Sequence, residues 1–380
     1  MRRVFTLWDG SFTSPAPPAE PGDAFEHSQP FTITGAGFGT NSGVQSTLGF
    51  GSDAILALPL GSAVPGYTDP ISGLVWSLDP VVQTADDTGF AVSEDIGFRT
   101  ARAVMRTPNN GSDGNTKPEQ AWIELDAGPI PDNTRILVSW WSKNTATLRP
   151  GSSPPGQLKQ FRLGTRSRLN GSNANSFYLS HNTNGAGVLV YKIDESTDPM
   201  QSSASGGLQC PRWDDDKNTR MDLYIRSGTR DTANGYIGGR IHKPADGVPI
   251  GAALRTFRNS SNTRNTAAFQ FLTAADPTPW RYLKWQNYYG NGLHTARTHL
   301  WGVYVQVGSW RHVELGDAPT YATCTRSEIC RWTSWSDTSV TFRARFGQLG
   351  SGPKWVYLFD DNGAVINPTG VELTSTSLTL

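Results

Sequence analysis

The sequence predicts an all-β fold in which a large β-sandwich is inserted into a small one. The composition is the first observation: 40 Gly, 25 Pro and only four Met in 380 residues are typical of many short strands joined by turns. The second is a series of runs rich in aromatic and branched residues, each bounded by Gly, Asn, Asp or Pro. The third is an opening strand, "FTIT" at 31–34, that runs into a glycine turn without a partner strand close by in sequence.

The elements follow in order along the chain. A Pro-rich stretch at 14–22 predicts an extended linker. We expect strands at 135–141, 177–182, 187–193, 220–228 and 299–308, and a hairpin over 235–251 that turns at 244–247. No segment predicts a helix of more than two turns.

The charge and hydropathy patterns exclude some partners. Lys plus Arg and Asp plus Glu are both 33, so the formal net charge is zero and no overall basic field exists to attract nucleic acid. No run of about 18 apolar residues occurs, which argues against a membrane span. We therefore expect neither a nucleic-acid partner nor a membrane span.

The last 70 residues predict a small sandwich that lacks its first hairpin. "HVELGDAP", "WSDTSVTFRARFG" and "GPKWVYLFDDNGAV" alternate apolar and polar residues between turns. Together with Gly35, Gly37, Phe38 and Gly39 of the opening turn, these strands resemble the IPT/TIG family of immunoglobulin-like domains, whose next strand is matched by 313–316. The resemblance implies that the partner of the opening strand lies some 270 residues downstream.

The inserted stretch resembles the concanavalin A-like lectin and glucanase jelly roll. The resemblance is carried by "DLYIRSGTRDTANGYIGGRIH", "RYLKWQNYYGNG" and "HLWGVYVQVG" in this order. We predict an arm and linker over 1–21, a split immunoglobulin-like (IPT/TIG-like) domain over 22–44 plus 309–380, and the jelly-roll domain over 45–308. Jelly rolls serve lectins, hydrolases and lyases alike, so only a site can decide the function.

A glycosidase site is incomplete in the sequence. Retaining glucanases of this fold carry Glu-x-Asp-x-x-Glu on one strand, because two carboxylates on one face can flank a glycosidic bond. In "WIELDAGP", Glu124 and Asp126 share a face, but Gly128 or Pro129 takes the place of the last carboxylate. We assign no catalytic residue.

Two further segments are similar to motifs of alginate-type lyases. "GRIH", with Arg240 and His242, and "WQNYYGNG", with Tyr288 and Tyr289, occur in the family's order. The lysine and glutamine of those motifs are missing. Because His242 begins a hairpin turn, we expect a solvated histidine at a sheet edge instead.

Metal sites have little support. Calcium is the one metal with a candidate, in "WDDDKN", where Asp214, Asp215 and Asp216 lack the spaced ligands of a known loop, so a solvated acidic turn is expected. His294 and His299 have no third ligand nearby for zinc. We predict no cofactor and no metal.

The cysteines leave two alternatives open. Cys324 and Cys330 lie close enough in "CTRSEIC" for a local disulfide. The other alternative is a pair of thiols in a reducing cell.

Thirteen tryptophans need an explanation. In "SWW" the side chains of Trp140 and Trp141 must point to opposite faces of the strand. Outward aromatic rings on a concave jelly-roll sheet can stack on sugars, although we favour packing over sugar binding. The glycan-binding candidates are Trp141, Trp285, Tyr288 and Tyr289.

Two functions are compatible with these features. The first is a non-enzymatic structural or adhesive protein displayed on a phage virion, as a capsid decoration, fibre or tail protein with glycan binding, in contact with other subunits and forming a homo-oligomer. The alternative is a secreted, extracellular or virion-borne polysaccharide lyase or glycoside hydrolase.

An ordered N-terminal arm needs a surface to bury its apolar residues. We predict that the assembly anchor consists of Val4, Phe5, Leu7 and Trp8.

Overall fold

The structure is a computed structural model, and part of the chain is described in it. The described residues are 29–48, 66–78, 90–93, 103–106, 122–144, 157–165, 167, 176–182, 188–194, 206–209, 217–232, 234–250, 255–256, 272, 277–290 and 298–380. Within these ranges the regular structure is β-strand apart from two 3₁₀ turns, η3 (Pro244–Asp246) and η4 (Tyr321–Thr323). The all-β prediction is therefore confirmed. No helix in the described ranges has the length and hydropathy needed to cross a membrane.

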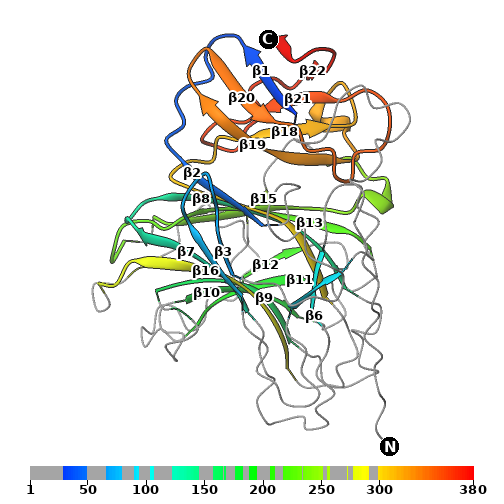
Figure 1. Ribbon diagram of the computed structural model, residues 1–380. Helices are drawn as coiled ribbons and strands as arrows, with labels where there is room; N and C mark the ends of the chain where they lie inside the picture. The colour runs from blue at the N-terminus through cyan, green and yellow to red at the C-terminus, as the bar shows by residue number, and fades with distance from the viewer. Residues whose placement is uncertain are drawn as a thin grey trace, which may run out of the picture.

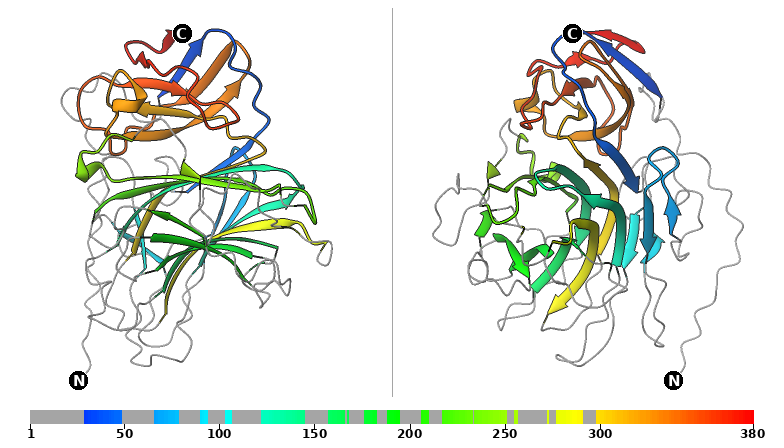
Figure 2. Two further views of the ribbon diagram at one scale, coloured as in Figure 1. Left: turned by 180° about the vertical axis from the view of Figure 1, so that it is seen from behind. Right: turned by 90° about the vertical axis from the view of Figure 1, so that its left-hand side faces the viewer.

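A small body of strands is stacked on two larger sheets, as Figure 1 shows. The body at the top of this view, which we call the C-terminal module, contains the opening strand and the last six strands of the chain. Below it lie two eight-stranded sheets, which we call the proximal and the distal sheet according to their distance from the module. Figure 2 shows the same stacking from behind and from the side.

The C-terminal module joins the two ends of the chain. The strand order is β22 (Val371–Glu372), β21 (Trp355–Leu358), β18 (Val313–Gly316), β19 (Ser327–Trp335), β20 (Ser339–Arg343), β1 (Pro30–Thr34) and β23 (Ser377–Thr379). β1 runs antiparallel to β20 and parallel to β23. The hydroxyls of Thr32 and Thr341, 309 residues apart, are 3.0 Å from each other. The opening strand therefore pairs far downstream, as predicted, but with β20 and β23 and not with 313–316, which forms β18 between β19 and β21.

The module closes around its own core because β19 belongs to two layers. The first half of β19 pairs with β18, and the second half pairs with β20 after a bend. Alternate residues of β1, β18, β20 and β21 point inward, including Ile33, Leu315, Phe342 and Leu358, each fully buried. Burial of a Leu, Ile or Phe side chain stabilises a fold by roughly 1.5 to 3 kcal/mol. The likeness to the IPT/TIG family stays a prediction.

The two other sheets form the jelly-roll sandwich. The proximal sheet has the order β15 (Arg255–Thr256), β14 (Tyr236–His242), β13 (Thr219–Arg226), β8 (Arg135–Asn144), β17 (Thr298–Val307), β6 (Ala103–Arg106) and β5 (Phe90–Ser93), and β2 (Val44–Leu48) also pairs with β17. The distal sheet has the order β12 (Gly206–Gln209), β11 (Val188–Asp194), β10 (Ser176–Asn182), β9 (Gln157–Gly164), β16 (Trp280–Gly290), β7 (Trp122–Ile130), β4 (Val75–Leu78) and β3 (Tyr67–Thr68).

One apolar core fills the space between the two jelly-roll sheets. Strand alternation puts Ile136, Val138 and Trp140 of β8 into this core, opposite Leu283 and Trp285 of β16. The other set of side chains on each strand points outward, which gives each sheet an outer face. These two outer faces are the surfaces on which a site could be built.

The predicted hairpin over 235–251 has its first strand and turn where expected, but its second strand lies further along the chain. The turn forms where expected, with η3 ending at Gly247, whose φ of 63° is left-handed and suits glycine. The strand that returns to pair with β14 is β15, which begins at Arg255. The loop is therefore longer than the sequence suggested.

The two connections between the module and the jelly roll lie side by side. They run from β1 to β2 and from β17 to β18, and Asn41 of the first donates a hydrogen bond to the carbonyl of Arg311 in the second, at 2.9 Å. A Cβ on Gly308 would lie 3.4 Å from the Cα of Gly43. Close entry and exit points are what an inserted domain requires. The predicted boundaries at 21/22, 44/45 and 308/309 stay predictions.

Candidate functional site

The two outer faces of the jelly roll differ in what covers them. The outer face of the proximal sheet packs against the C-terminal module, where Leu137, Tyr224 and Tyr304 form a buried cluster with Trp310 and Ile329 of the module side. The outer face of the distal sheet points away from the module (Figure 1). The distal face is therefore where we look for a ligand site.

A row of charged side chains crosses the distal face, and we call it the charged row: Glu124, Lys284 and Arg162. Lys284 of β16 lies opposite Glu124 of β7 on one side and Arg162 of β9 on the other. Their exposed fractions are 4%, 1% and 3% for Glu124, Lys284 and Arg162. Ser167 donates a 2.8 Å hydrogen bond to Glu124. Buried charges on the outside of a sheet are costly and mark a structured polar layer.

Next to the charged row, the distal face is accessible at what we call the open corner: Val75, Asp126, Arg281 and Tyr282. Asp126 and Tyr282 lie opposite each other on β7 and β16, and Val75 of β4 lies opposite Asp126. The side chains of Arg281 and Asp126 are 42% and 30% exposed, and Val75 is 46% exposed. Tyr282 is half-buried. An aromatic ring, an apolar side chain and an ion pair are thus grouped on one surface.

The ion pair of the open corner has a well-defined geometry. Nε and Nη2 of Arg281 donate to the two carboxylate oxygens of Asp126, both at 2.7 Å. The guanidinium also lies 5.3 Å from the ring centre of Tyr282. These hydrogen bonds from Arg281 lower the pKa of Asp126, so that this carboxylate is ionised at neutral pH. It is poorly suited to donate a proton as a general acid.

A bulge in β7 lies at the position where the glucanase-like motif is incomplete. Between Trp280 and Tyr282 the register with β7 shifts from Ile130 to Asp126. Gly128 has a φ of 69°, and its N–H donates to Asp126 at 2.9 Å. This turn takes the chain off the regular ladder at the position where a second acid would stand. Glu124 and Asp126 do share a face, as the alternation predicts.

Two of the predicted glycan-binding residues are buried by packing. Trp141 is 1% exposed and stacks on Trp301, with ring centres 6.4 Å apart. Trp285 is 2% exposed and lies in the sandwich core, with its ring centre 5.3 Å from that of Phe161. Neither ring presents a free face to a sugar in this structure. Trp140 lies in the core and Trp141 on the opposite side, as the "SWW" alternation predicts.

The remaining predicted residues fall on parts that the structure describes little or not at all. Tyr288 and Tyr289 belong to β16, but their side chains lie outside the described residues, and their binding role stays a prediction. The anchor residues Val4, Phe5, Leu7 and Trp8, the acidic turn Asp214, Asp215 and Asp216, and His294 also lie outside them. His299 is buried, at 4% exposure. Among the described side chains no group of three His, Cys, Asp or Glu could hold a metal.

The lyase-like reading of "GRIH" requires a correction. β14, which carries Arg240 and His242, belongs to the proximal sheet, whereas β16 with Tyr288 belongs to the distal sheet. The two segments therefore do not share a face. His242 is not a solvated edge histidine: it is 6% exposed because the C-terminal module covers it, and its Nε2 donates to the carbonyl of Thr325.

The two cysteines of "CTRSEIC" are separate thiols. Both Cys324 and Cys330 are free and buried. Burial raises the pKa of Cys324 to about 11 and that of Cys330 to about 12, so neither is a ready nucleophile at neutral pH.

Sequence reasoning missed the charged row and the open corner. A signal was present in "RYLKWQ", where Lys284 separates Leu283 from Trp285. Because alternate residues share a face, an outward Lys284 requires an inward Trp285. The position of Arg162 opposite Lys284 depends on the pairing of β9 with β16, which are more than 100 residues apart in the chain. Local pattern could not give it.

Comparisons with known proteins give only distant structural likeness. No protein-family model matches the chain, and no curated protein matches its sequence. The PL-14 alginate lyase from Aplysia kurodai is similar over 65% of this chain and 97% of its own, with 12% identity and a TM-score of 0.39. An endo-1,3-β-glucanase from Streptomyces sioyaensis is similar over 61% and 88%, with 13% identity and a TM-score of 0.36. Arcelin-5, a lectin-like defense protein from Phaseolus vulgaris, is similar over 62% and 98%, with 11% identity and a TM-score of 0.30. At these values the likeness carries no argument about function.

Proposed function

We propose that this protein is a non-enzymatic carbohydrate-binding protein, which binds glycan at the open corner of the distal sheet. The observation that carries the proposal is the grouping of Tyr282 with the Arg281–Asp126 pair on an accessible sheet face. The half-buried ring of Tyr282 offers an apolar surface for the C–H face of a sugar, and the ion pair offers donors and acceptors for its hydroxyls. Neighbouring Val75 extends the apolar part.

We further propose that the C-terminal module is the base of the protein in a larger assembly, the surface of a phage virion. The support is geometric: the module packs on the proximal sheet, and the distal sheet lies on the other side of the proximal sheet (Figure 1). A base on one side leaves the distal sheet turned outward. The virion location, with other virion subunits as partners and homo-oligomer formation, rests on the sequence features alone. An extracellular location is the alternative.

Binding at the open corner is tested by titrating the full chain with alginate, laminarin and bacterial capsule extracts. For any of these glycans that the wild type binds, Tyr282→Ala should weaken binding by about tenfold, because loss of one aromatic contact costs on the order of 1 kcal/mol. Val248→Ala is the matched control, since Val248 is 61% exposed and lies beyond β14 of the other sheet. Equal binding by wild type and Tyr282→Ala would exclude the open corner as the site.

An enzymatic alternative is favoured by one observation, the placement of Lys284 between Glu124 and Arg162. Lys284 and Arg162 carry the charge that would attract the acid group of a uronate if the substrate displaced what covers them. Incubation of the full chain with the same glycans, followed by an assay for cleavage products, distinguishes the two functions. Release of unsaturated or reducing ends, abolished by Lys284→Met, would establish a lyase or hydrolase.

The predicted role of the N-terminal arm as the assembly anchor is tested by deleting residues 1–20. The truncated protein should keep its melting transition and its glycan binding but lose association with its assembly or with itself. Normal assembly of the truncated protein would show that the N-terminal arm is not the anchor.

A further inference from the structure

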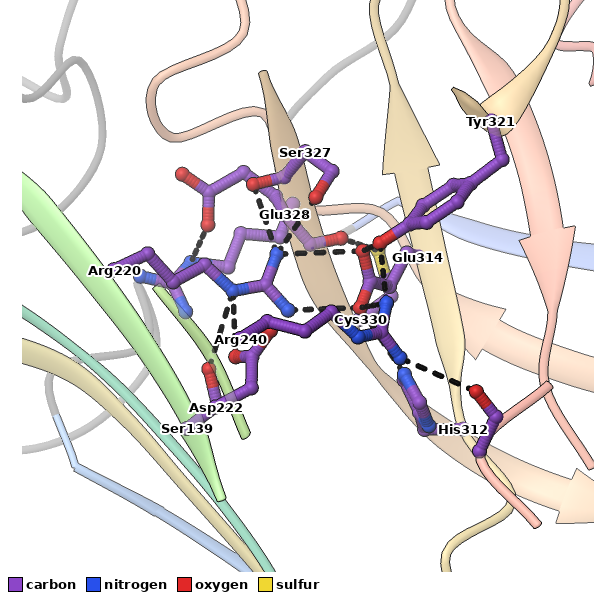
Figure 3. Close-up of polar contacts among 12 residues, drawn as sticks. Ser139, Arg220, Asp222, Arg240, His312, Glu314, Tyr321, Ser327, Glu328 and Cys330 are labelled. Carbon is purple, nitrogen blue, oxygen red and sulfur yellow. Dashed lines mark hydrogen bonds and ion pairs between the residues drawn. The ribbon is translucent and has the colours of Figure 1, made fainter. Parts of the chain in front are cut away.

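A layer of buried charged side chains lies between the proximal sheet and the C-terminal module (Figure 3). We call it the charged interface, and every member is at most 4% exposed. It consists of Arg220, Asp222 and Arg240 from the proximal sheet and Glu314, Glu328 and Arg345 from the module. An interface between two sandwiches is usually sealed by apolar side chains, so buried ions here require a specific reason.

Arg220 is the central contact of the charged interface. Its Nη2 donates to Glu314 at 2.8 Å, and its Nη1 donates to the hydroxyl and the carbonyl of Ser327 at 2.9 and 3.0 Å. On its own side, Nε donates to Asp222 at 2.9 Å. One guanidinium therefore joins β13 of the jelly roll to β18 and β19 of the module. Figure 3 shows these bonds converging on Arg220.

Glu314 stays ionised in this setting although it is fully buried. Burial by itself raises the pKa of Glu314, but the charge of Arg220 and the hydrogen bond from His312 lower it by more. His312 Nε2 lies 3.1 Å from the carboxylate, and the hydroxyl of Tyr321 donates to it at 3.0 Å. The net effect is a pKa well below the usual value.

Arg240 makes a second connection across the same interface. Its Nη1 donates to the hydroxyl of Tyr321 at 2.6 Å, and its guanidinium lies 4.8 Å from the ring centre of Phe359. It also lies 5.2 Å from the ring centre of Tyr224 on its own sheet. Aromatic rings of both bodies thus surround one buried cation.

Two tryptophans, one from each body, donate hydrogen bonds across the interface. Trp141 of β8 donates its indole N–H to Glu328 of the module at 3.2 Å. Trp310, which precedes β18, donates its indole N–H to the backbone carbonyls of Ile136 and Ile225, at 3.0 and 3.2 Å. The contact with Glu328 explains why Trp141 is buried although it lies on the outer face of the proximal sheet.

The two bodies carry complementary charge. The proximal sheet contributes two arginines and one aspartate, a net charge of plus one, and the module contributes two glutamates and one arginine, a net charge of minus one. Docking against this surface pairs the buried ions of both bodies, whereas docking against a surface without matching charges would bury ions that had lost their hydration and gained no partner. We infer that the outer face of the proximal sheet is a dedicated docking surface for the chain's own C-terminal module, and that the two bodies unfold as one cooperative unit.

The inference is tested on the full chain by calorimetry and hydrogen exchange. The wild type should unfold in one transition, with equal calorimetric and van't Hoff enthalpies. Amides of β18 and β21 in the module should exchange through the same opening as amides of β8 and β13 in the jelly roll. Two resolved transitions in the wild type, or module amides that open independently, would overturn the inference.

Single substitutions test whether the Arg220–Glu314 ion pair holds the two bodies together. In Arg220→Met, module amides should lose protection by roughly a hundredfold or more relative to those of β7 and β16, because one partner of a buried ion pair is left alone. Glu314→Gln, which keeps the shape of the side chain, should act in the same direction and serves if Arg220→Met does not fold. Arg281→Met removes the exposed ion pair of the open corner and is the matched control, with a single transition as in the wild type. Unchanged cooperativity and protection in both interface variants would refute the role of this pair.

Discussion

Acidification should destabilise the protein through His242, which is buried where the module covers β14. Its Nε2 donates to the carbonyl of Thr325, and its Nδ1 has no hydrogen-bond partner among the described atoms. A second proton would therefore have to sit on a nitrogen without an acceptor. Burial, with the positive charge of Arg220 nearby, lowers the pKa of His242 from 6.5 to about 4. Asp222 and Glu314 act in the opposite direction but do not cancel this effect.

The sign and size of the effect follow from linkage. The folded-state pKa is lower than the unfolded one, so the unfolded chain binds the proton more tightly. The contribution to stability is present above pH 6.5 and is lost as the pH falls from 6.5 toward 4. With an unfolded pKa of about 6.5, His242 should reduce the free energy of unfolding by about 2 to 3 kcal/mol between roughly pH 7.5 and pH 4.5.

Urea unfolding curves of wild type and His242→Gln, recorded at these two pH values, measure the effect. Glutamine keeps an N–H for Thr325 but does not titrate, so the variant should lose about 2 to 3 kcal/mol less than the wild type on acidification. Other carboxylates and histidines titrate in both proteins and cancel in the difference. Equal losses in the two proteins, within about 0.5 kcal/mol, would mean that His242 is not held neutral by the interface.

Two other predictions concern the stability and reactivity of single sites. Cys324 and Cys330 should resist labelling by a thiol reagent in the folded protein and react fully in denaturant, because burial raises the pKa of both thiols; rapid labelling, followed by site-resolved mass spectrometry, would contradict their burial. Gly302→Ala should cost about 1 to 3 kcal/mol in the free energy of unfolding, since Gly302 has a φ of 57° and an added Cβ would lie 2.0 Å from Nη2 of Arg345. An alanine variant as stable as wild type in urea would show that Arg345 can move without loss.

The sequence alone determined the all-β class, the face on which many side chains lie, and the fact that the first strand pairs with a distant part of the chain. Alternation of apolar and polar residues, and glycine at turns that need positive φ, are local properties that each strand carries with it. They predicted that Trp140 and Trp141 face opposite ways and that Glu124 and Asp126 face the same way. The sequence placed the partner of the opening strand in the C-terminal part of the chain but matched it to 313–316, whereas β1 pairs with β20 and β23.

Tertiary structure alone decided which outward faces are covered and which are open. Strand alternation predicts that Trp141 points away from the core of the jelly roll, but it cannot predict that Trp141 forms a hydrogen bond with Glu328 of the module. In the same way, His242 looks like an edge histidine until the module is docked on β14. Arg281, Asp126 and Tyr282 come together only when β7 and β16 pair across a bulge. The physical reason is that burial of an outer face depends on contacts between segments far apart in the chain, and a local pattern carries no information about them.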